Sequence, residues 1–322
     1  MAKYVSENSR AKRRKQQKAR RMAMYSTIAI FILVISFVIV KVIEVFKNDE
    51  KDIPLLDNSG TEDITDENTP TNDIVIGPVI GDTTLDIVKS DIDILRTTSN
   101  GRVELSYFDD AIFMGDSLAD GFKVYGGWMN LKNTSAIYLT QQGTTPRTFL
   151  QPGVMVDAGE GPVDVWATIE QRQPGKMYIT LGTNALMGME PEEFIDGYYK
   201  LIDKIKATSP NTVIYVTTIT PTTEKKAAQE PRLSYDRIYQ SNQLIAKMCN
   251  EKGLMLINLY DVMKNDSGYL NEDIAASDGY HLTKTGYSWW FDYLITHTKY
   301  DPNSPYIPGS PYYLAETPEQ EN

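Results

Sequence analysis

Short apolar runs alternate with longer amphipathic segments between residues 87 and 300, and this alternation leaves few folds open to the chain. The apolar runs contain no charged residue, as expected of strands that are buried on both faces of a sheet. The predicted strands are 111–114, 135–139, 177–181, 213–217 and 254–259, and the predicted helices are 163–171, 191–207, 235–252 and 284–298. Because strands and helices alternate, we predict a doubly wound α/β fold with a parallel sheet and right-handed crossovers. In such sheets a functional site lies beyond the carboxyl ends of the strands.

A stretch without any charged residue runs from Met22 to Val40. As a helix it would be about 28 Å long, close to the roughly 30 Å thickness of the hydrocarbon core of a bilayer. Nine Lys and Arg residues precede it and acidic residues follow it, an asymmetry that places the N-terminus in the cytoplasm. A cleaved signal peptide is the competing interpretation, but no small-residue cleavage site follows the long apolar run. We therefore expect a basic cytoplasmic tail at 1–21, a single transmembrane signal anchor at 22–46, and the remainder of the chain outside the cell.

The composition changes after the expected anchor. Residues 47–86 contain eleven acids and two lysines among Asn, Thr, Gly and Pro, which predicts a disordered stalk because such a segment buries too little apolar surface to fold. The proline-rich segment 301–322 is expected to be an extended tail, which leaves 87–300 as the main domain. Outside the basic tail the chain is strongly acidic, with a net charge of −11 overall, and this argues against a nucleic-acid partner. The single cysteine, Cys249, cannot form an intrachain disulfide, and its helical spacing from Ile245 predicts a position in the core.

Three residues that suit acyl transfer lie next to the ends of predicted elements. Ser117 follows the first predicted strand and is the candidate nucleophile, because a serine hydroxyl attacks a carbonyl once an imidazole removes its proton. His281 precedes the last predicted helix and is the candidate base. Asp278, three residues earlier, can fix the imidazole tautomer and stabilise the imidazolium. The second histidine of the chain, His297, falls in the last turn of that helix, where a surface position is expected.

The negative charge that develops on the carbonyl oxygen needs preorganised donors, and removing one of them typically costs about 2.7–4 kcal/mol. The candidate donors are the backbone N–H of Ser117, the backbone N–H of Gly143 and the side-chain amide of Asn184. The carboxylates near the serine, including Asp116, have no second cluster at metal-ligand spacing. We therefore predict no metal and no other cofactor.

Four blocks of the sequence resemble those of the GDSL/SGNH hydrolase family and come in that family's order: IFMGDSLADGF, QQGTTPRT, ITLGTNAL and SDGYHLTKTGY. The resemblance covers most of 105–297 and implies a flavodoxin-like three-layer fold. It also carries over five catalytic positions, namely Ser117, Gly143, Asn184, Asp278 and His281. Two positions depart from the family pattern. Ala185 stands where many members have aspartate, a variant similar to the extracellular domains of peptidoglycan O-acetyltransferases, and Gln142 stands where an asparagine usually precedes the glycine.

These features together predict a membrane-anchored, extracellular serine esterase that removes small acyl groups, chiefly acetyl, from a cell-surface polysaccharide or from peptidoglycan. The expected anchor and stalk motivate this substrate, because they would hold the site close to the membrane face of the cell wall. Three alternatives stay open: an O-acetyltransferase, which would need a membrane acyl-donor partner, a catalytically silent wall-binding scaffold, and a lipase acting on the adjacent bilayer. The acidic main domain disfavours the lipase, since anionic lipid would repel it.

Overall fold

The computed structural model describes residues 101–125, 131–159, 161–301 and 303–307 of the 322-residue chain. The expected cytoplasmic tail, anchor and stalk lie outside these residues, as does most of the expected C-terminal tail. Within the described ranges, no helix combines the length and the hydropathy that crossing a bilayer requires.

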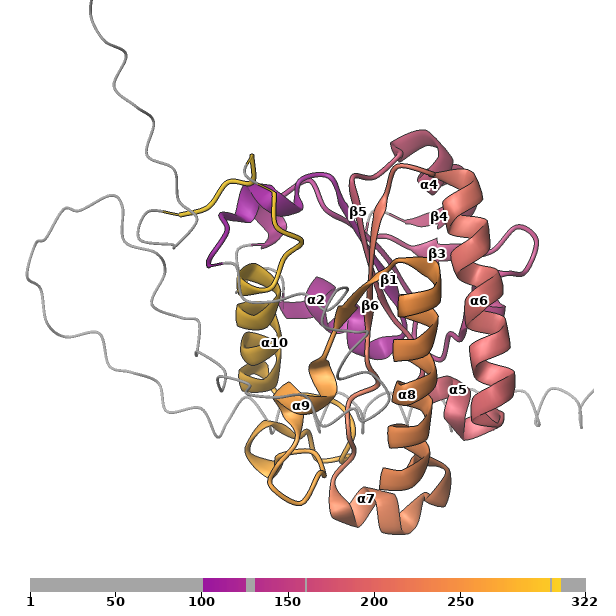
Figure 1. Ribbon diagram of the computed structural model, residues 1–322, viewed down its shortest axis with the longest axis vertical. Helices are drawn as coiled ribbons and strands as arrows, with labels where there is room; N and C mark the ends of the chain where they lie inside the picture. The colour runs from indigo at the N-terminus through magenta and orange to yellow at the C-terminus, as the bar shows by residue number, and fades with distance from the viewer. Residues whose placement is uncertain (1–100, 126–130, 160, 302, 308–322) are drawn as a thin grey trace, which may run out of the picture. The chain divides into compact units, whose positions relative to one another are not determined.

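A five-stranded parallel sheet forms the centre of the described domain (Figure 1). Its strands are β1 (Ala111–Gly115), β2 (Ile137–Thr140), β5 (Lys176–Thr180), β6 (Val213–Thr217) and β7 (Met255–Ile257), in the spatial order β2-β1-β5-β6-β7. Counted by chain position within this sheet, the order is 2-1-3-4-5, which is that of flavodoxin-like folds. The order reverses at β1, and such a switch point leaves a crevice at the carboxyl ends of the strands. The predicted parallel sheet is therefore confirmed, with strand ends that lie at most two residues from those expected.

Helices cover both faces of this sheet and close two hydrophobic cores. Side chains of β1 alternate between these cores, with Ile112 and Met114 in one and Ala111 and Phe113 in the other, as the two-residue period of a strand requires. The first core is closed by α4 (Val165–Arg172), α6 (Pro191–Thr208) and α8 (Tyr235–Lys252), and the second by α2 (Ser117–Tyr125), α9 (Leu259–Met263) and α10 (Lys284–Thr296). The three layers are visible in Figure 1, where α6 and α8 lie on one side of the strands and α10 on the other.

Local sequence explains where the long helices begin and end. Helix α6 begins at Pro191, which is followed by Glu192 and Glu193 near the positive end of the helix dipole. Helix α8 is capped by Gly253, whose φ of 63° is the left-handed conformation that favours glycine. Cys249 of α8 is fully buried, which confirms the predicted core position.

Several short elements were not anticipated from the sequence. They are the antiparallel hairpin of β3 (Met155–Asp157) and β4 (Pro162–Asp164), and the helices α3 (Pro146–Phe149), α5 (Thr183–Gly188) and α7 (Glu224–Gln229). Helices of one or two turns show no amphipathic period, and they are marginal in isolation, so tertiary contacts must hold them. Helices α2, α5, α7 and α9 each follow a strand of the sheet, and α5, α7 and α9 lie towards the lower end of the molecule in Figure 1. These helices therefore surround the carboxyl edge of the sheet, where a site is expected.

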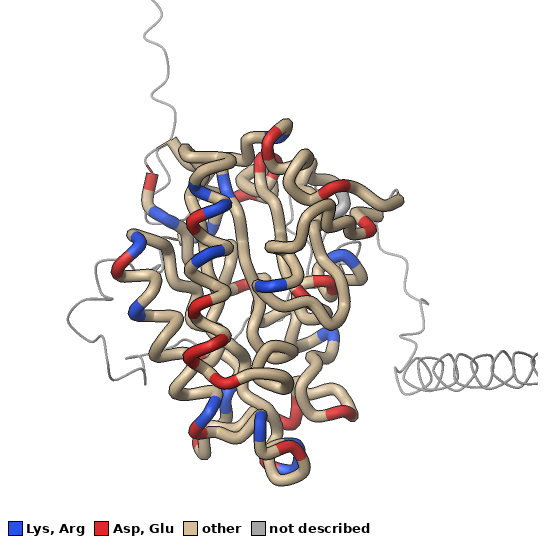
Figure 2. The backbone as a smooth tube through the Cα atoms, turned by 90° about the vertical axis from the view of Figure 1, so that its right-hand side faces the viewer, with Lys and Arg blue, Asp and Glu red and all other residues tan. Residues whose placement is uncertain are grey.

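Acidic and basic residues are interspersed over the face that carries α6 (Figure 2). Within α6, Lys200 pairs with Asp196 at 2.6 Å, and Lys252 of α8 pairs with Asp203 of α6 at 2.5 Å. Exposed pairs of this kind contribute little, about 0–1 kcal/mol each. Among the described residues, this face does not present the uniform basic field that binds nucleic acid.

Candidate active site

The structure brings Ser117, His281 and Asp278 together at the carboxyl edge of the sheet. Ser117 is the first residue of α2, just beyond β1. The other two lie in a tight loop before α10, in which the Ala276 N–H donates to the His281 carbonyl at 2.8 Å and the Gly279 N–H to the Ala276 carbonyl at 2.9 Å. Ser117 Oγ lies 2.7 Å from His281 Nε2, and His281 Nδ1 lies 2.6 Å from a carboxylate oxygen of Asp278. The three side chains form one hydrogen-bonded series from hydroxyl to carboxylate.

The carboxylate of Asp278 decides which nitrogen of His281 carries the hydrogen. Burial raises the pKa of Asp278, but hydrogen bonds from the His281 ring and from the N–H groups of His281 and Tyr280 outweigh burial and hold this pKa at about 2. The carboxylate is therefore ionised at neutral pH and can only accept hydrogen bonds. Neutral His281 must donate to it from Nδ1, which leaves Nε2 to accept from the Ser117 hydroxyl. This is the protonation state that a general base needs.

Asp116 also takes part in the site. From the sequence, we expected of this carboxylate only that it has no metal-ligating neighbours. One carboxylate oxygen accepts from the Leu118 N–H at 3.0 Å and so caps the start of α2. The other accepts from the side-chain amide of Asn184 at 3.1 Å. An amide nitrogen has two hydrogens, so Asp116 orients Asn184 through one hydrogen and leaves the second for another acceptor. The position of Asp116 between a strand and the first helical residue, where a capping acceptor is favoured, was the signal that could have identified it.

Keeping this carboxylate ionised costs folding free energy. Asp116 is only 1% exposed, and its burial raises its pKa from the ordinary 3.8 to about 6, against the opposing hydrogen bonds from Leu118 and Asn184 and the nearby imidazole of His281. Because the folded-state pKa is raised, the contribution of Asp116 to stability is present below about pH 4 and is lost as the pH rises through about 6. At neutral pH the protein therefore retains a buried charged acceptor beside Asn184 at the expense of stability.

Gly143 lies in the turn that follows β2, and this turn is tied to the end of β1. The Gln141 N–H and the Thr144 hydroxyl both donate to the Gly115 carbonyl, each at 3.1 Å, and Gly115 lies two residues before Ser117. Gly143 has a φ of 76°, and a Cβ at this position would meet nothing within 4 Å. Backbone conformation alone favours glycine here. In the described part of the chain no hydrogen bond joins Gly143 to Ser117, His281 or Asp278. The function of the Gly143 N–H as an oxyanion donor stays a prediction.

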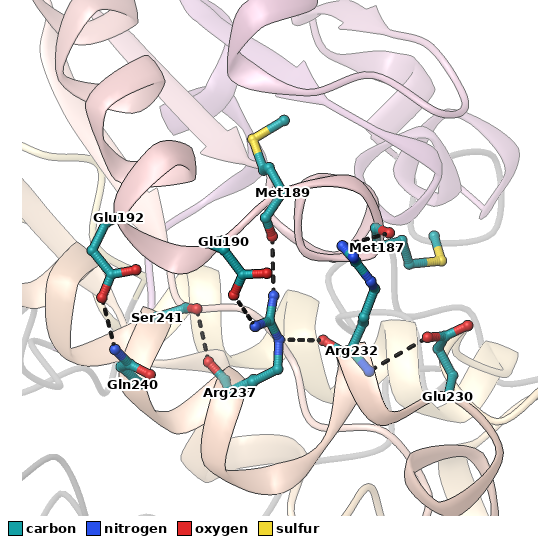
Figure 3. Close-up of polar contacts among 9 residues, drawn as sticks. All are labelled: Met187, Met189, Glu190, Glu192, Glu230, Arg232, Arg237, Gln240 and Ser241. Carbon is teal, nitrogen blue, oxygen red and sulfur yellow. Dashed lines mark hydrogen bonds and ion pairs between the residues drawn. The ribbon is translucent and has the colours of Figure 1, made fainter.

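Two arginines hold the connection between α5 and α6, which follows Asn184 in the chain (Figure 3). Arg237 of α8 forms an ion pair with Glu190. Arg232, in the turn η5 (Pro231–Leu233) before α8, donates to the Met187 carbonyl at 3.4 Å, and its own carbonyl accepts from Arg237 at 3.2 Å. Helix α5 is therefore fixed at its C-terminal end by these arginines, and near its start by the contact of Asn184 with Asp116.

Helix α7 packs against the loop that carries the imidazole. The Thr223 N–H donates to the Gly279 carbonyl at 2.9 Å. Gly279 has a φ of 82°, and a Cβ there would lie 2.5 Å from Thr223 Oγ1 and 2.9 Å from Lys226 Cβ. The Lys226 ammonium lies 5.1 Å from the centre of the Tyr280 ring, and the centre of that ring lies 4.2 Å from the centre of the His281 ring. The glycine and the adjoining rings together fix the imidazole relative to α7.

The sequence model of the GDSL-like lipase/acylhydrolase family matches residues 113–289, which is more than half of the chain and includes every candidate site residue. This chain belongs to that family. The resemblance predicted from the four sequence blocks is thereby confirmed. No curated protein matches the sequence.

Several solved structures are similar to this GDSL family member. A GDSL-like lipase from Bacteroides thetaiotaomicron is 15% identical with a TM-score of 0.44, and the match covers 57% of this chain and 84% of that one. A carbohydrate esterase family 3 protein from Talaromyces cellulolyticus is 12% identical with a TM-score of 0.41, over 57% of this chain and 92% of that one. The periplasmic domain of a lipopolysaccharide acetyltransferase from Salmonella ser. Paratyphi A is 18% identical with a TM-score of 0.40, over 66% of this chain and 96% of that one.

Proposed function

We propose that this GDSL family member is a serine esterase that removes small acyl groups, chiefly acetyl, from cell-surface glycans or peptidoglycan. The observation that carries the proposal is the hydrogen-bonded series from Ser117 Oγ through the imidazole of His281 to Asp278, with separations of 2.7 and 2.6 Å. A serine hydroxyl with an imidazole and an ionised carboxylate in this order is an activated nucleophile.

The proposed reaction has two halves that use the same base. His281 Nε2 takes the proton of the Ser117 hydroxyl while Oγ bonds to the ester carbonyl carbon, and Asp278 stabilises the imidazolium. The imidazolium then returns the proton to the leaving glycan oxygen, the carbon–oxygen bond breaks, and the acyl group stays on Ser117. A water molecule, deprotonated by His281, attacks this acyl-serine, releases the carboxylic acid and restores the hydroxyl.

In this proposal three donors stabilise the oxyanion: the N–H groups of Ser117 and Gly143 and the amide hydrogen of Asn184 that Asp116 does not use. The contact between Asp116 and Asn184 at 3.1 Å supports the assignment of the amide, because it orients a donor before substrate arrives and so removes the cost of reorganisation.

The proposed substrate and location agree with the openness of the site and with the N-terminal sequence. The side chains of His281 and Asp278 are 29% and 41% exposed, so an ester carried on a polymer can approach them without entering a closed cavity. The charge-free run within 22–46 and the acidic segment 47–86 support a domain tethered outside the membrane. A membrane acyl-donor partner is required only if the reaction is transfer.

The proposal is tested by measuring acetate release from acetylated xylan and from acetylated peptidoglycan by the purified full-length chain. Ser117→Ala should lower release by at least about 10³-fold, since it removes the nucleophile. Ser277→Ala is the matched control, because this exposed serine lies next to Asp278 but outside the triad, and it should retain activity. Acetate from neither substrate with the wild-type chain, or equal release by both variants, would rule the proposal out.

Transfer of the acyl group to a glycan is the second candidate, because Ala185 after Asn184 resembles the pattern of peptidoglycan O-acetyltransferases. Incubation with an activated acetyl ester and chito-oligosaccharide separates the two reactions. Hydrolysis predicts mainly free acetate, whereas acetylated sugar in excess of acetate would establish transfer.

A further inference from the structure

An open groove of about 450 Å³ lies between α7, the start of α8 and the loop after α9. None of its lining residues belongs to the proposed triad. The polar and aromatic residues that line it are Glu224 of α7, Ser234, Tyr235 and Asp236 at the start of α8, and Ser267 and Tyr269 of the loop.

Tyr235 supplies a fixed aromatic surface in this groove. Its side chain is 39% exposed, and its ring is stacked on Tyr239 with centroids 6.0 Å apart and planes 6° apart. Tyr269 approaches with its ring centroid at 6.3 Å and the two planes at 61°, and Gly268 passes so close that a Cβ there would lie 2.4 Å from the Tyr235 ring. Because its neighbours hold this partly exposed ring in place, the ring offers apolar surface at little cost in conformational entropy.

Hydrogen-bonding groups line the same groove. Glu224 and Asp236 contribute carboxylates, and Ser234 and Ser267 contribute hydroxyls. Ser234 stands at the N-cap of α8, yet its side chain makes no capping hydrogen bond, so its hydroxyl can serve a ligand. Carboxylate oxygens accept from ligand hydroxyls and repel ligand anions. A partly exposed aromatic ring, together with acceptors and hydroxyls in the same open groove, suits a neutral, hydroxyl-rich ligand.

Helix α7 connects this groove to the catalytic loop. Glu224 of α7 lines the groove, while Thr223, the N-cap of this helix, and Lys226 within it contact Gly279 and Tyr280 beside the imidazole. The groove and the triad are thus separated by one short helix, whose diameter with side chains is about 10–12 Å. A polymer chain is long enough to contact both places at once.

We infer that the groove is a second glycan-binding site. It holds a neutral sugar residue of the same polysaccharide molecule whose acyl group is presented to Ser117. The sugar packs on Tyr235, and its hydroxyls donate to Glu224 and Asp236. The link to the reaction rests on the proposed function, whereas binding of the sugar does not, and the two can be measured separately.

Binding is measured by calorimetry with xylohexaose and the full-length Ser117→Ala chain, which cannot turn substrate over. Adding Tyr235→Ala to this Ser117→Ala chain should weaken its binding of xylohexaose by at least about fivefold. Tyr300→Ala is the matched control, because Tyr300 is also exposed and stacked on another tyrosine, Tyr306, but lies outside the groove, and it should leave binding unchanged. If Tyr235→Ala disturbs folding, Asp236→Asn replaces it as the test, since it removes an acceptor and keeps the ring.

Equal binding of xylohexaose by the Tyr235 or Asp236 variant and its parent would overturn the inference. So would saturable binding of tetramethylammonium that displaces the sugar, because the groove would then recognise an organic cation through its rings and carboxylates. In the active chain, Tyr235→Ala should raise KM for acetylated xylan by a larger factor than it changes kcat/KM for p-nitrophenyl acetate. If the wild-type chain hydrolyses neither acetylated xylan nor p-nitrophenyl acetate, the proposed function is refuted. The calorimetric result would still decide whether the sugar site exists.

Discussion

Replacing Asp116 by asparagine tests how the buried carboxylate serves the site. The substitution keeps the size of the side chain but puts one amide where two donors converge, the Leu118 N–H and the Asn184 amide. The single amide oxygen can accept from only one of these two donors, because they approach from different directions. Asn184 should therefore lose its fixed orientation. We expect kcat for p-nitrophenyl acetate to fall, by at most the roughly 10²–10³-fold that the loss of one oxyanion donor causes.

The same substitution lowers kcat but should make the variant more stable, relative to wild type, as the pH rises. Burial raises the pKa of Asp116 from 3.8 to about 6, and a rise of this size corresponds to about 3 kcal/mol. The wild-type chain loses this contribution as the pH rises from about 4 through about 6, whereas asparagine does not titrate. The unfolding free energy of the variant relative to wild type should therefore increase by up to about 3 kcal/mol between about pH 4 and pH 8.

Urea unfolding at both pH values measures the stability, and steady-state hydrolysis at the higher pH measures kcat. Asn184→Ala and the double variant provide the control. If Asp116 acts through Asn184, its substitution should cost little further kcat once the amide is gone. If Asp116→Asn retains kcat within about twofold of wild type, or if the two losses multiply in the double variant, Asp116 does not act through Asn184. If the relative stability is independent of pH, Asp116 is not a buried carboxylate with a raised pKa.

Two further predictions concern the loop before α10. Asp278→Asn should lower kcat by roughly 10³–10⁴-fold at neutral pH, because an amide can donate to His281 Nδ1 and favour the wrong tautomer; a loss below about tenfold would contradict the assigned tautomer. Gly279→Ala should destabilise the chain more than Gly153→Ala in urea unfolding. Both glycines have positive φ, 82° and 64°, so each substitution should cost about 1–2 kcal/mol for the left-handed backbone. Only the Cβ at 279 would meet α7, at 2.9 Å from Lys226 Cβ. Equal urea midpoints would show that α7 is not packed on this loop.

The central sheet and the long helices could be predicted because their signals are local and repeated. The predicted ranges 213–217 and 235–252 coincide with β6 and α8, where an apolar run and a 3.6-residue period are unbroken. The hairpin of β3 and β4 has only three residues in each strand, too few to show a period. It is held partly from outside, by the Lys123 ammonium of α2, which donates to the Asp157 carbonyl at 3.0 Å.

Residue types and chain order were enough to predict that Ser117, Asp278 and His281 lie close together, but not which contacts support them. The hydrogen bond from Asn184 to Asp116 joins residues 68 positions apart. It exists because β1 and β5 are paired in parallel with Gly115 opposite Thr180, which aligns the two strand ends. The groove beside α7 is likewise assembled from three separate segments, and no pattern within any one of them signals it.

The site of covalent labelling by a fluorophosphonate, which reacts with an activated serine, tests most directly whether His281 activates the hydroxyl of Ser117. The full-length chain is treated at neutral pH, and the adduct is located by peptide mass spectrometry in the wild type, Ser117→Ala and His281→Ala. One adduct is expected, on Ser117; it should be absent in the serine variant and form at least about 10²-fold more slowly without the imidazole. An unlabelled wild-type chain, an adduct on another serine, or equal labelling rates with and without His281 would contradict it.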